Sequence, residues 1–150
     1  MTREEKMIQN NVTEHIEVGV EMSTDFDHGR YLNLLTRRLF DSFHPKKALD
    51  VGCEKGELVN VFQKYGVDIY GIDISKQSLY HAKDVVQDAL LCQADAEMLP
   101  FKNNTFDLVT AHHSLEHLKN PDYFIRECKR ILRPDGVVCI VVPISPLGLT

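Results

Sequence analysis

The sequence predicts an α/β protein in which a doubly wound, mostly parallel sheet lies between helices, giving three α/β/α layers. After Pro45, short apolar runs alternate with stretches of helical periodicity, which is typical of repeated strand–helix–strand units. Turn residues such as Gly66 and Gly136 separate these segments. The composition, with 43% hydrophobic and 26% charged residues, is that of an ordinary globular domain.

The 150 residues suffice for one domain, which we divide into an N-terminal segment, residues 1–45, and a core, residues 46–150. The net charge of −5 provides no basic field for a phosphate backbone, which argues against general nucleic-acid binding. Most of that acidity belongs to residues 1–30, where seven acidic side chains stand against three basic ones.

Targeting and redox signals favour the cytoplasm. The four cysteines have apolar neighbours and no CxxC spacing, which favours free thiols in a reducing compartment. The first residues are polar and do not resemble a signal peptide. No apolar run approaches the roughly 18–20 residues of a membrane span, so we expect a cytoplasmic protein.

The N-terminal segment gives one clear element. Residues 1–26 have scattered apolar positions without a clean period, so a frayed helix, a lid and a tail all stay open. From His28 to Phe43 the apolar residues fall on one helical face, and the following His44-Pro45 ends this helix. The core then begins with a buried strand at 48–51, followed by a glycine-containing turn and a helix through Tyr65.

The rest of the core continues the same alternation. We expect strands at 69–72, 90–92 and 106–110, with a helix that is capped by Ser75 and runs to about Gln87. A further helix begins at Asn120-Pro121. Residues 133–136 are expected to form a turn into the last strand, at 137–142.

The first strand-to-helix turn is where chemistry is expected, because ligands of doubly wound sheets bind beyond the carboxyl ends of the strands. In this turn, Gly52 and Gly56 let the backbone approach a ligand closely. Asp73, at the end of the second core strand, can accept both hydroxyls of a ribose. A glycine turn with a distal acid predicts an adenosine-bearing cofactor, although two merely tight turns would look the same. The dinucleotide fingerprint GxGxxG is absent, and Asp50 suits a ligand ammonium better than a pyrophosphate.

Five motifs stand in order along the core. They are Ala48–Cys53 with Gly56, Gly71–Ser75, Asp95–Phe101, Phe106–Val109 followed by Leu115–Leu118, and Leu132–Gly136. Together they resemble class I S-adenosylmethionine-dependent methyltransferases, most closely the small-molecule branch that includes quinone-biosynthesis enzymes. The resemblance implies a Rossmann-like fold, S-adenosyl-L-methionine as cofactor, and methyl transfer to an O, N or C atom of a small molecule.

The resemblance also implies roles for the first turn. Gly52, Cys53 and Gly56 would line the methionine part of the cofactor, and Asp50 would lie near its ammonium group. Glu54 stands where the family most often has a glycine, so its side chain is expected to point away from the cofactor.

Other residues would hold the remaining parts of the cofactor. The resemblance places Asp73 on the ribose hydroxyls and Ile74 on one face of the adenine. Asp95 would accept from the adenine amino group, and the backbone N–H of Ala96 would donate to the ring. Arg30 has the spacing at which some relatives hold the cofactor carboxylate, although an exposed helix arginine is the commoner explanation.

Three histidines, His112, His113 and His117, follow the fourth core strand, where the methyl acceptor is expected. Imidazole titrates near neutrality, so His112 or His113 is the candidate base where the acceptor must lose a proton. The resemblance also places His112 beside the methionine part of the cofactor. Because successive strand residues point to opposite faces, we expect one of the pair to face the pocket. A structural role for each histidine stays open, and no metal site is predicted because a third ligand is missing.

The last strand, at 137–142, would be an exposed apolar edge, because the family normally continues with a helix and an antiparallel hairpin. We therefore expect this edge to be covered by a second copy of the chain in a homodimer, by the N-terminal segment or by a partner. The short chain leaves a second function open, namely a methyltransferase-like module that binds a cofactor or a partner without turnover. The missing GxGxxG disfavours an NAD-dependent oxidoreductase, and the identity of the methyl acceptor is not readable.

Overall fold

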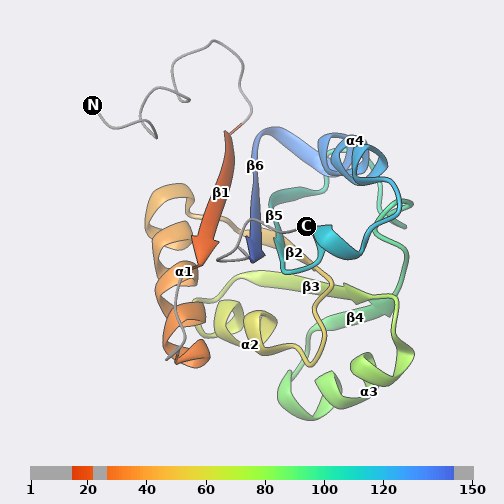
Figure 1. Cartoon of the computed structure of the whole chain (residues 1–150). Coiled ribbons are helices and arrows are strands. Elements are labelled where there is room, and N and C mark those ends of the chain that lie inside the picture. Colours follow the sequence, from red (N-terminus) through yellow and green to blue (C-terminus); the bar gives the residue numbers. More distant parts are fainter. Residues whose placement is uncertain (1–14, 22–26, 144–150) are drawn as a thin grey trace.

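The computed structural model describes residues 15–21 and 27–143, which form one six-stranded sheet with helices on both faces (Figure 1). The elements in chain order are β1 (His15–Glu21), α1 (His28–Phe43), β2 (Lys47–Val51), α2 (Glu57–Lys64), β3 (Asp68–Asp73), α3 (Lys76–Val85), β4 (Leu90–Gln93), β5 (Phe106–His112), the 3₁₀ turn η2 (Leu115–His117), α4 (Pro121–Ile131) and β6 (Leu132–Pro143). The strand order is β1-β6-β5-β2-β3-β4, and every neighbouring pair is parallel. The predicted α/β class, with its doubly wound sheet, is confirmed.

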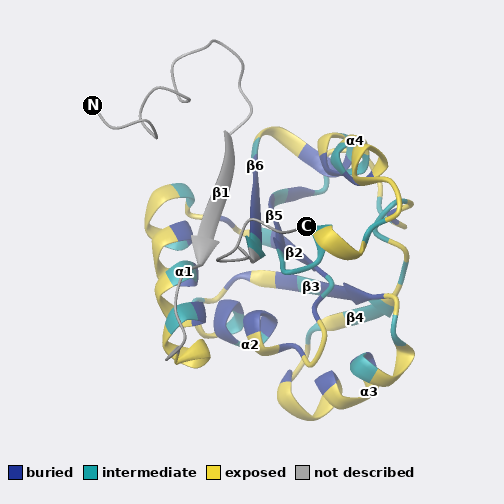
Figure 2. Cartoon of the chain, viewed as in Figure 1, coloured by how far each residue is buried: buried dark blue, intermediate teal, exposed yellow. Residues whose placement is uncertain are grey.

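The two faces of the sheet are covered by different helices. Helices α1, α2 and α3 pack on the face that carries Ala48 and Leu108, whereas α4 packs on the face that carries Leu49 and Val109. Adjacent strand residues therefore serve opposite layers, as the pleat requires. Figure 2 shows the central strands β2 and β5 largely buried and the outer sides of the helices exposed. Burial on both faces explains why the central strands read as continuous apolar runs.

Local signals set the ends of the helices. Asp27 Oδ1 accepts from the backbone N–H of Arg30 at 3.0 Å, which caps the start of α1. At the other end, His44 is left-handed and its N–H donates to the Phe40 carbonyl at 2.8 Å. The predicted helix from His28 to Phe43 is confirmed at both bounds.

The predicted turn at 133–136 is wrong as a boundary between α4 and the last strand. Strand β6 begins directly after α4, because Leu132 already pairs with Phe106 of β5. The next pair is Leu108 with Val137, so β6 advances five residues while β5 advances two. The extra residues bulge out of one long strand, and Arg133 in the bulge donates to Asp107 Oδ1 at 2.7 Å.

Strand β1 covers the edge that β6 would otherwise expose. The pairing is parallel and runs from His15 opposite Val137 to Glu21 opposite Pro143. Figure 1 shows β1 beside β6 at one end of the sheet. Covering by the N-terminal segment, one of the three expected arrangements, is therefore confirmed. The lid, tail and frayed-helix alternatives for the other residues before position 27 lie outside the described residues.

Candidate functional site

A cavity of about 740 Å³ lies where the carboxyl ends of β2, β3, β4 and β5 meet. Its wall contains six of the residues expected from the sequence, which are Gly52, Asp73, Ile74, Asp95, Ala96 and His113. The volume falls within the range of about 300–1,000 Å³ that is usual for small-molecule sites. The parallel order of the strands brings these residues together, because every carboxyl end lies on the same edge of the sheet.

The β2–α2 loop needs glycine at two positions for different reasons. Gly52 has φ +73°, and a Cβ there would overlap the Ser114 hydroxyl and lie 2.9 Å from Ser114 Cβ. Gly56 has φ +76°, and its Cβ would lie 2.5 Å from Val86 Cγ2, which is at the end of α3. Gly56 is therefore required by the packing of the two helices. It does not line the cavity, whereas Gly52 does.

Asp73 holds two neighbouring loops in place. Its Oδ2 accepts from the backbone N–H of Glu54 at 2.9 Å, and its Oδ1 accepts from that of Ser75 at 2.8 Å. A carboxylate has about four lone-pair sites, so these bonds leave acceptor capacity for ligand hydroxyls. Glu54 has φ +46° and is among the residues that line the cavity.

An apolar platform stands beside that acid. The Ile74 side chain is 68% exposed, and it lines the same cavity as Asp73. Such a side chain offers a flat ring an apolar face on which to pack, with hydroxyl acceptors next to it.

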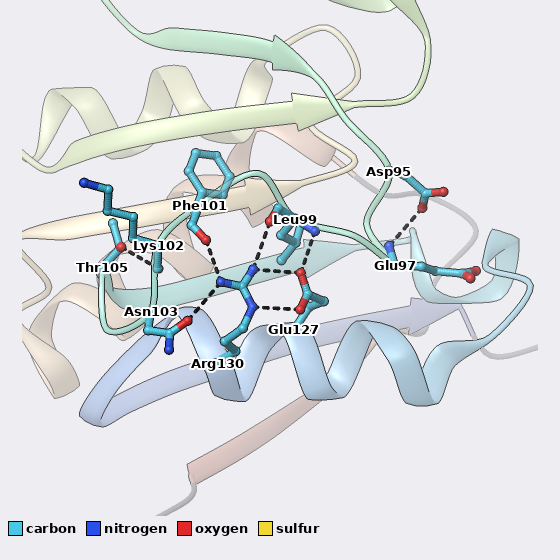
Figure 3. Close-up of polar contacts among 9 residues, drawn as sticks. All are labelled: Asp95, Glu97, Leu99, Phe101, Lys102, Asn103, Thr105, Glu127 and Arg130. Atoms are coloured by element: carbon cyan, nitrogen blue, oxygen red, sulfur yellow. Dashed lines mark hydrogen bonds and ion pairs between the residues drawn. The ribbon is translucent and has the colours of Figure 1, made fainter.

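The segment after β4 forms the opposite wall. Asp95 Oδ1 accepts from the backbone N–H of Glu97 at 2.9 Å (Figure 3). The Met98 N–H donates to the Asp95 carbonyl at 3.0 Å. These bonds make a tight turn that presents Asp95 and Ala96 to the cavity. Asp95 keeps its second carboxylate oxygen without a partner among the described residues.

Asp50 lies at the end of β2 and is almost completely buried, with 2% of its surface exposed. The pKa of Asp50 is raised to about 7, chiefly by burial and in smaller part by the nearby carboxylates of Asp73 and Glu54. The Thr110 hydroxyl donates to Asp50 Oδ1 at 2.8 Å and opposes this rise in pKa. A ligand cation beside Asp50 would favour its charged form.

A second cavity of about 210 Å³ adjoins the first. Its wall contains five of the expected residues, which are Asp50, Gly52, Cys53, His112 and His113. His113 and Gly52 line both cavities, so the two spaces meet at the ends of β2 and β5.

Both histidines at the end of β5 line this second cavity, whereas His113 and not His112 lines the larger one. His113 has φ +52°, which breaks the alternation of the strand and stacks its ring on that of His112 at 4.1 Å between centroids. The pKa of His112 is lowered to about 4, chiefly by burial and in smaller part by His113 and His28. His112 is therefore neutral near pH 7. Its Nε2 is buried without a hydrogen-bond partner among the described residues.

Helix α1 contributes a different residue from the one expected. Arg30 is exposed and lines neither cavity. His28, two residues earlier, lines the smaller cavity, and its Nε2 lies 3.2 Å from Glu57 Oε2. Sequence reasoning also missed Thr110, for which a polar residue inside an apolar strand was the available signal. Ser114 had no such signal, because its contact with Gly52 depends on the loop geometry.

Residues 15–21 and 27–143 contain no cluster of three or more His, Cys, Asp or Glu side chains that could hold a metal ion. In the same ranges, no helix is long and apolar enough to cross a membrane.

The parallel sheet, with its cavity at the carboxyl ends of the strands, defines the class of protein as a Rossmann-like α/β domain. Residues 49–140 match the family described as a methyltransferase domain. The chain belongs to this family, the class I S-adenosylmethionine-dependent methyltransferases.

Curated relatives cover the same core. Ubiquinone biosynthesis O-methyltransferase of Aliivibrio fischeri is 37% identical over 98 residues, which are 62% of this chain and 42% of that protein. A Danio rerio mitochondrial protein named arginine-hydroxylase NDUFAF5 is 38% identical over 91 residues, covering 60% of this chain and 28% of that protein. The chain thus spans less than half the length of these relatives.

The fold is also similar to that of a solved structure. The PH0226 protein of Pyrococcus horikoshii OT3 superposes with a TM-score of 0.69 at 24% identity, covering 77% of this chain and 58% of that one. At this identity the likeness shows the fold alone.

Proposed function

We propose that this chain binds S-adenosylmethionine in the larger cavity and transfers its methyl group to an O, N or C atom of a small molecule. The observation that carries the proposal is the pairing at the end of β3, where the Asp73 carboxylate stands beside Ile74, which is 68% exposed on the same wall. An acid that accepts ribose hydroxyls next to an apolar platform suits an adenosine. Membership of the methyltransferase family supports the choice of donor.

The described residues fit the parts of that donor. Asp73 would accept from the ribose hydroxyls, and Ile74 would pack on the adenine. Asp95 and the Ala96 N–H would bind the edge of the ring from the opposite wall. The methionine part would extend past Gly52 toward the smaller cavity, where Asp50 would meet its ammonium group.

S-adenosylmethionine carries an already activated methyl group, so the chain mainly has to align the acceptor and exclude water. His113 lines both cavities, so it would take up a proton from the acceptor. Because the pKa of His112 is about 4, this ring is a weak base, and it would serve by orienting the acceptor.

Calorimetric titration with S-adenosylmethionine and S-adenosylhomocysteine tests the proposal. We expect both to bind the wild-type chain, and we expect Asp73→Asn to weaken binding by about tenfold or more, since it removes a charged hydrogen-bond acceptor. Asp68→Asn is the matched control, because Asp68 lies at the other end of the same strand and lines neither cavity. Absence of binding to the wild-type chain would sink the proposal.

A second candidate is a domain that binds the cofactor without methyl transfer. It is favoured by the Danio rerio relative, whose name is that of a hydroxylase. Incubation with methyl-labelled S-adenosylmethionine and a set of phenol, amine and carbon-acid acceptors separates the two. Binding with no labelled product from any acceptor would favour this candidate.

A further inference from the structure

The cavity wall that carries Asp95 and Ala96 has no regular secondary structure of its own. Residues 94–105 connect β4 to β5 through turns and bends, although residues 94–97 all line the cavity. A segment of this kind keeps a defined position only where other elements bind its backbone. Helix α4 packs on the same face of the sheet as Leu99 and Phe101, and it supplies those contacts.

Arg130, in the last turn of α4, binds three groups of this segment (Figure 3). Its guanidinium donates to the Leu99 carbonyl at 2.9 Å, to the Phe101 carbonyl at 2.6 Å and to Asn103 Oδ1 at 3.2 Å. The planar fork of an arginine can reach several acceptors at fixed angles, which the point charge of a lysine cannot do.

Glu127 completes the arrangement one turn earlier. Its two carboxylate oxygens accept from Arg130 Nε and Nη2, both at 2.8 Å, and Oε2 also accepts from the backbone N–H of Leu99 at 2.7 Å. The hydrogen bond from Arg130 lowers the pKa of Glu127, and the hydrogen bond to Glu127 raises that of Arg130, so both are charged near neutrality. The two side chains are 19% and 32% exposed, which limits competition from water. Together they hold both the N–H and the C=O of Leu99.

A second anchor acts two residues before Leu99. Glu97 Oε1 accepts from the backbone N–H groups of Lys119 and Asn120, at 2.8 and 2.9 Å, where α4 begins. The short stretch with Asp95 and Ala96 therefore precedes two attachments, one at each end of the same helix. Displacement of either attachment would move the wall on which the adenine edge is recognised.

We propose that Glu127 and Arg130 form a positioning pair that sets the selectivity of the site for the adenine end of the donor. This inference rests on the proposed function. Neither residue lines a cavity, so the pair acts through the backbone of Leu99. Loss of the pair would raise the KM for the donor more than it lowers kcat at saturation, because the groups near the reacting methyl are held by other loops.

The experiment compares the binding of S-adenosylhomocysteine with that of S-inosylhomocysteine, in which the adenine amino group is replaced by a carbonyl. Wild-type protein is expected to prefer the adenine form by about tenfold or more, the effect of one charge-assisted hydrogen bond. Arg130→Lys keeps the charge but loses the fork, and we expect most of that preference to disappear. Hydrogen exchange at the amides of residues 95–103 should become faster in the same variant.

Two further variants make the test specific. Glu127→Gln keeps an oxygen that can accept from the Leu99 amide, so it should retain more of the preference than Arg130→Lys. Arg133→Lys is the matched control, since Arg133 forms a 2.7 Å ion pair with Asp107 and lines neither cavity. This control should keep both the preference and the wild-type exchange rates.

The outcomes separate this inference from the proposed function. Wild-type protein that binds neither homocysteine compound would overturn the proposed function. A normal wild-type preference that persists in Arg130→Lys, or an equal loss of affinity for both compounds, would overturn the positioning role alone. If Arg130→Lys does not fold, Glu127→Ala decides the matter by the same ratio, because it removes the acceptors of both the Leu99 N–H and Arg130.

Discussion

Replacement of Gly52 by alanine tests how the cavity wall is built. The residue has φ +73°, and an added Cβ would overlap the Ser114 hydroxyl and lie 2.9 Å from Ser114 Cβ. Gly66 offers a matched control, because it has the same φ of +73° and nothing within 4 Å of an added Cβ. The two substitutions therefore share the backbone cost, and only one of them meets a neighbour.

The expected losses of unfolding free energy follow from two contributions, the left-handed backbone and the contact with Ser114. A left-handed backbone costs a residue with a side chain about 1–2 kcal/mol, and this is all that Gly66→Ala should lose. Overpacking against a held neighbour adds about 1–3 kcal/mol, so Gly52→Ala should lose about 2–5 kcal/mol of unfolding free energy. At about 2–4 °C per kcal/mol for a chain of this size, Tm should fall by about 2–8 °C for Gly66→Ala and about 4–20 °C for Gly52→Ala.

Thermal unfolding and calorimetric titration with S-adenosylhomocysteine measure the two effects. Gly52→Ala should also weaken binding, because Gly52 lines both cavities, whereas Gly66→Ala should leave affinity unchanged. Ser114→Gly removes the clashing atoms, so the double variant should lose less stability than the sum of the two single variants. Equal losses for the two alanine variants, or strict additivity in the double variant, would refute this account of the loop.

Two residues should give stability slopes of opposite sign with pH. Folding raises the pKa of Asp50 from 3.8 to about 7, so the native state binds this proton more tightly and stability falls as pH rises between those values. Folding lowers the pKa of His112 from 6.5 to about 4, so its contribution rises with pH in that window. In urea unfolding, the free energy of unfolding should therefore rise more steeply with pH for Asp50→Asn than for the wild type, and it should fall with pH for His112→Asn. Parallel slopes in the two variants would contradict both assignments. Ile74→Glu should weaken the binding of S-adenosylhomocysteine by about tenfold by removing the apolar platform. Leu34→Glu is its control, because Leu34 is similarly exposed, at 56%, but lines neither cavity, and equal affinities would rule the platform out.

The elements of the core were predictable because their patterns are local. Apolar residues at helical spacing and a Pro45 stop were enough to predict α1 at both bounds. β1 was missed, although Ile16, Val18 and Val20 alternate with period two, because the strand that it pairs with is more than 100 residues later in the chain. Local patterns predict elements, but they do not report which distant strand completes an edge.

The residues of the candidate site also divide into those that could be predicted from the sequence and those that could not. Asp73, Ile74 and Asp95 were predictable because they lie in motifs at or just after the ends of β3 and β4, and the parallel topology brings such positions to one edge. The arrangement of His112 and His113 was not predictable, because it depends on the left-handed backbone of His113. Residues that act through backbone groups, such as Arg130, gave no signal at all in the sequence.

The order of the strands also determines how the site is held together. The Ala94 N–H donates to the Asp73 carbonyl at 3.2 Å, which ties the segment after β4 to β3. The Glu54 N–H donates to the Asp73 carboxylate at 2.9 Å, and the Ser114 hydroxyl donates to the Val51 carbonyl at 2.9 Å, which tie β2 to β3 and β5 to β2. Each loop is thus hydrogen-bonded to the strand beside the one that it follows. A shift of one loop therefore displaces the neighbouring part of the cavity wall as well. Variants at the cavity wall should therefore change affinity and loop exchange together, whereas variants in the β5–β6 bulge, such as Arg133→Lys, should change neither.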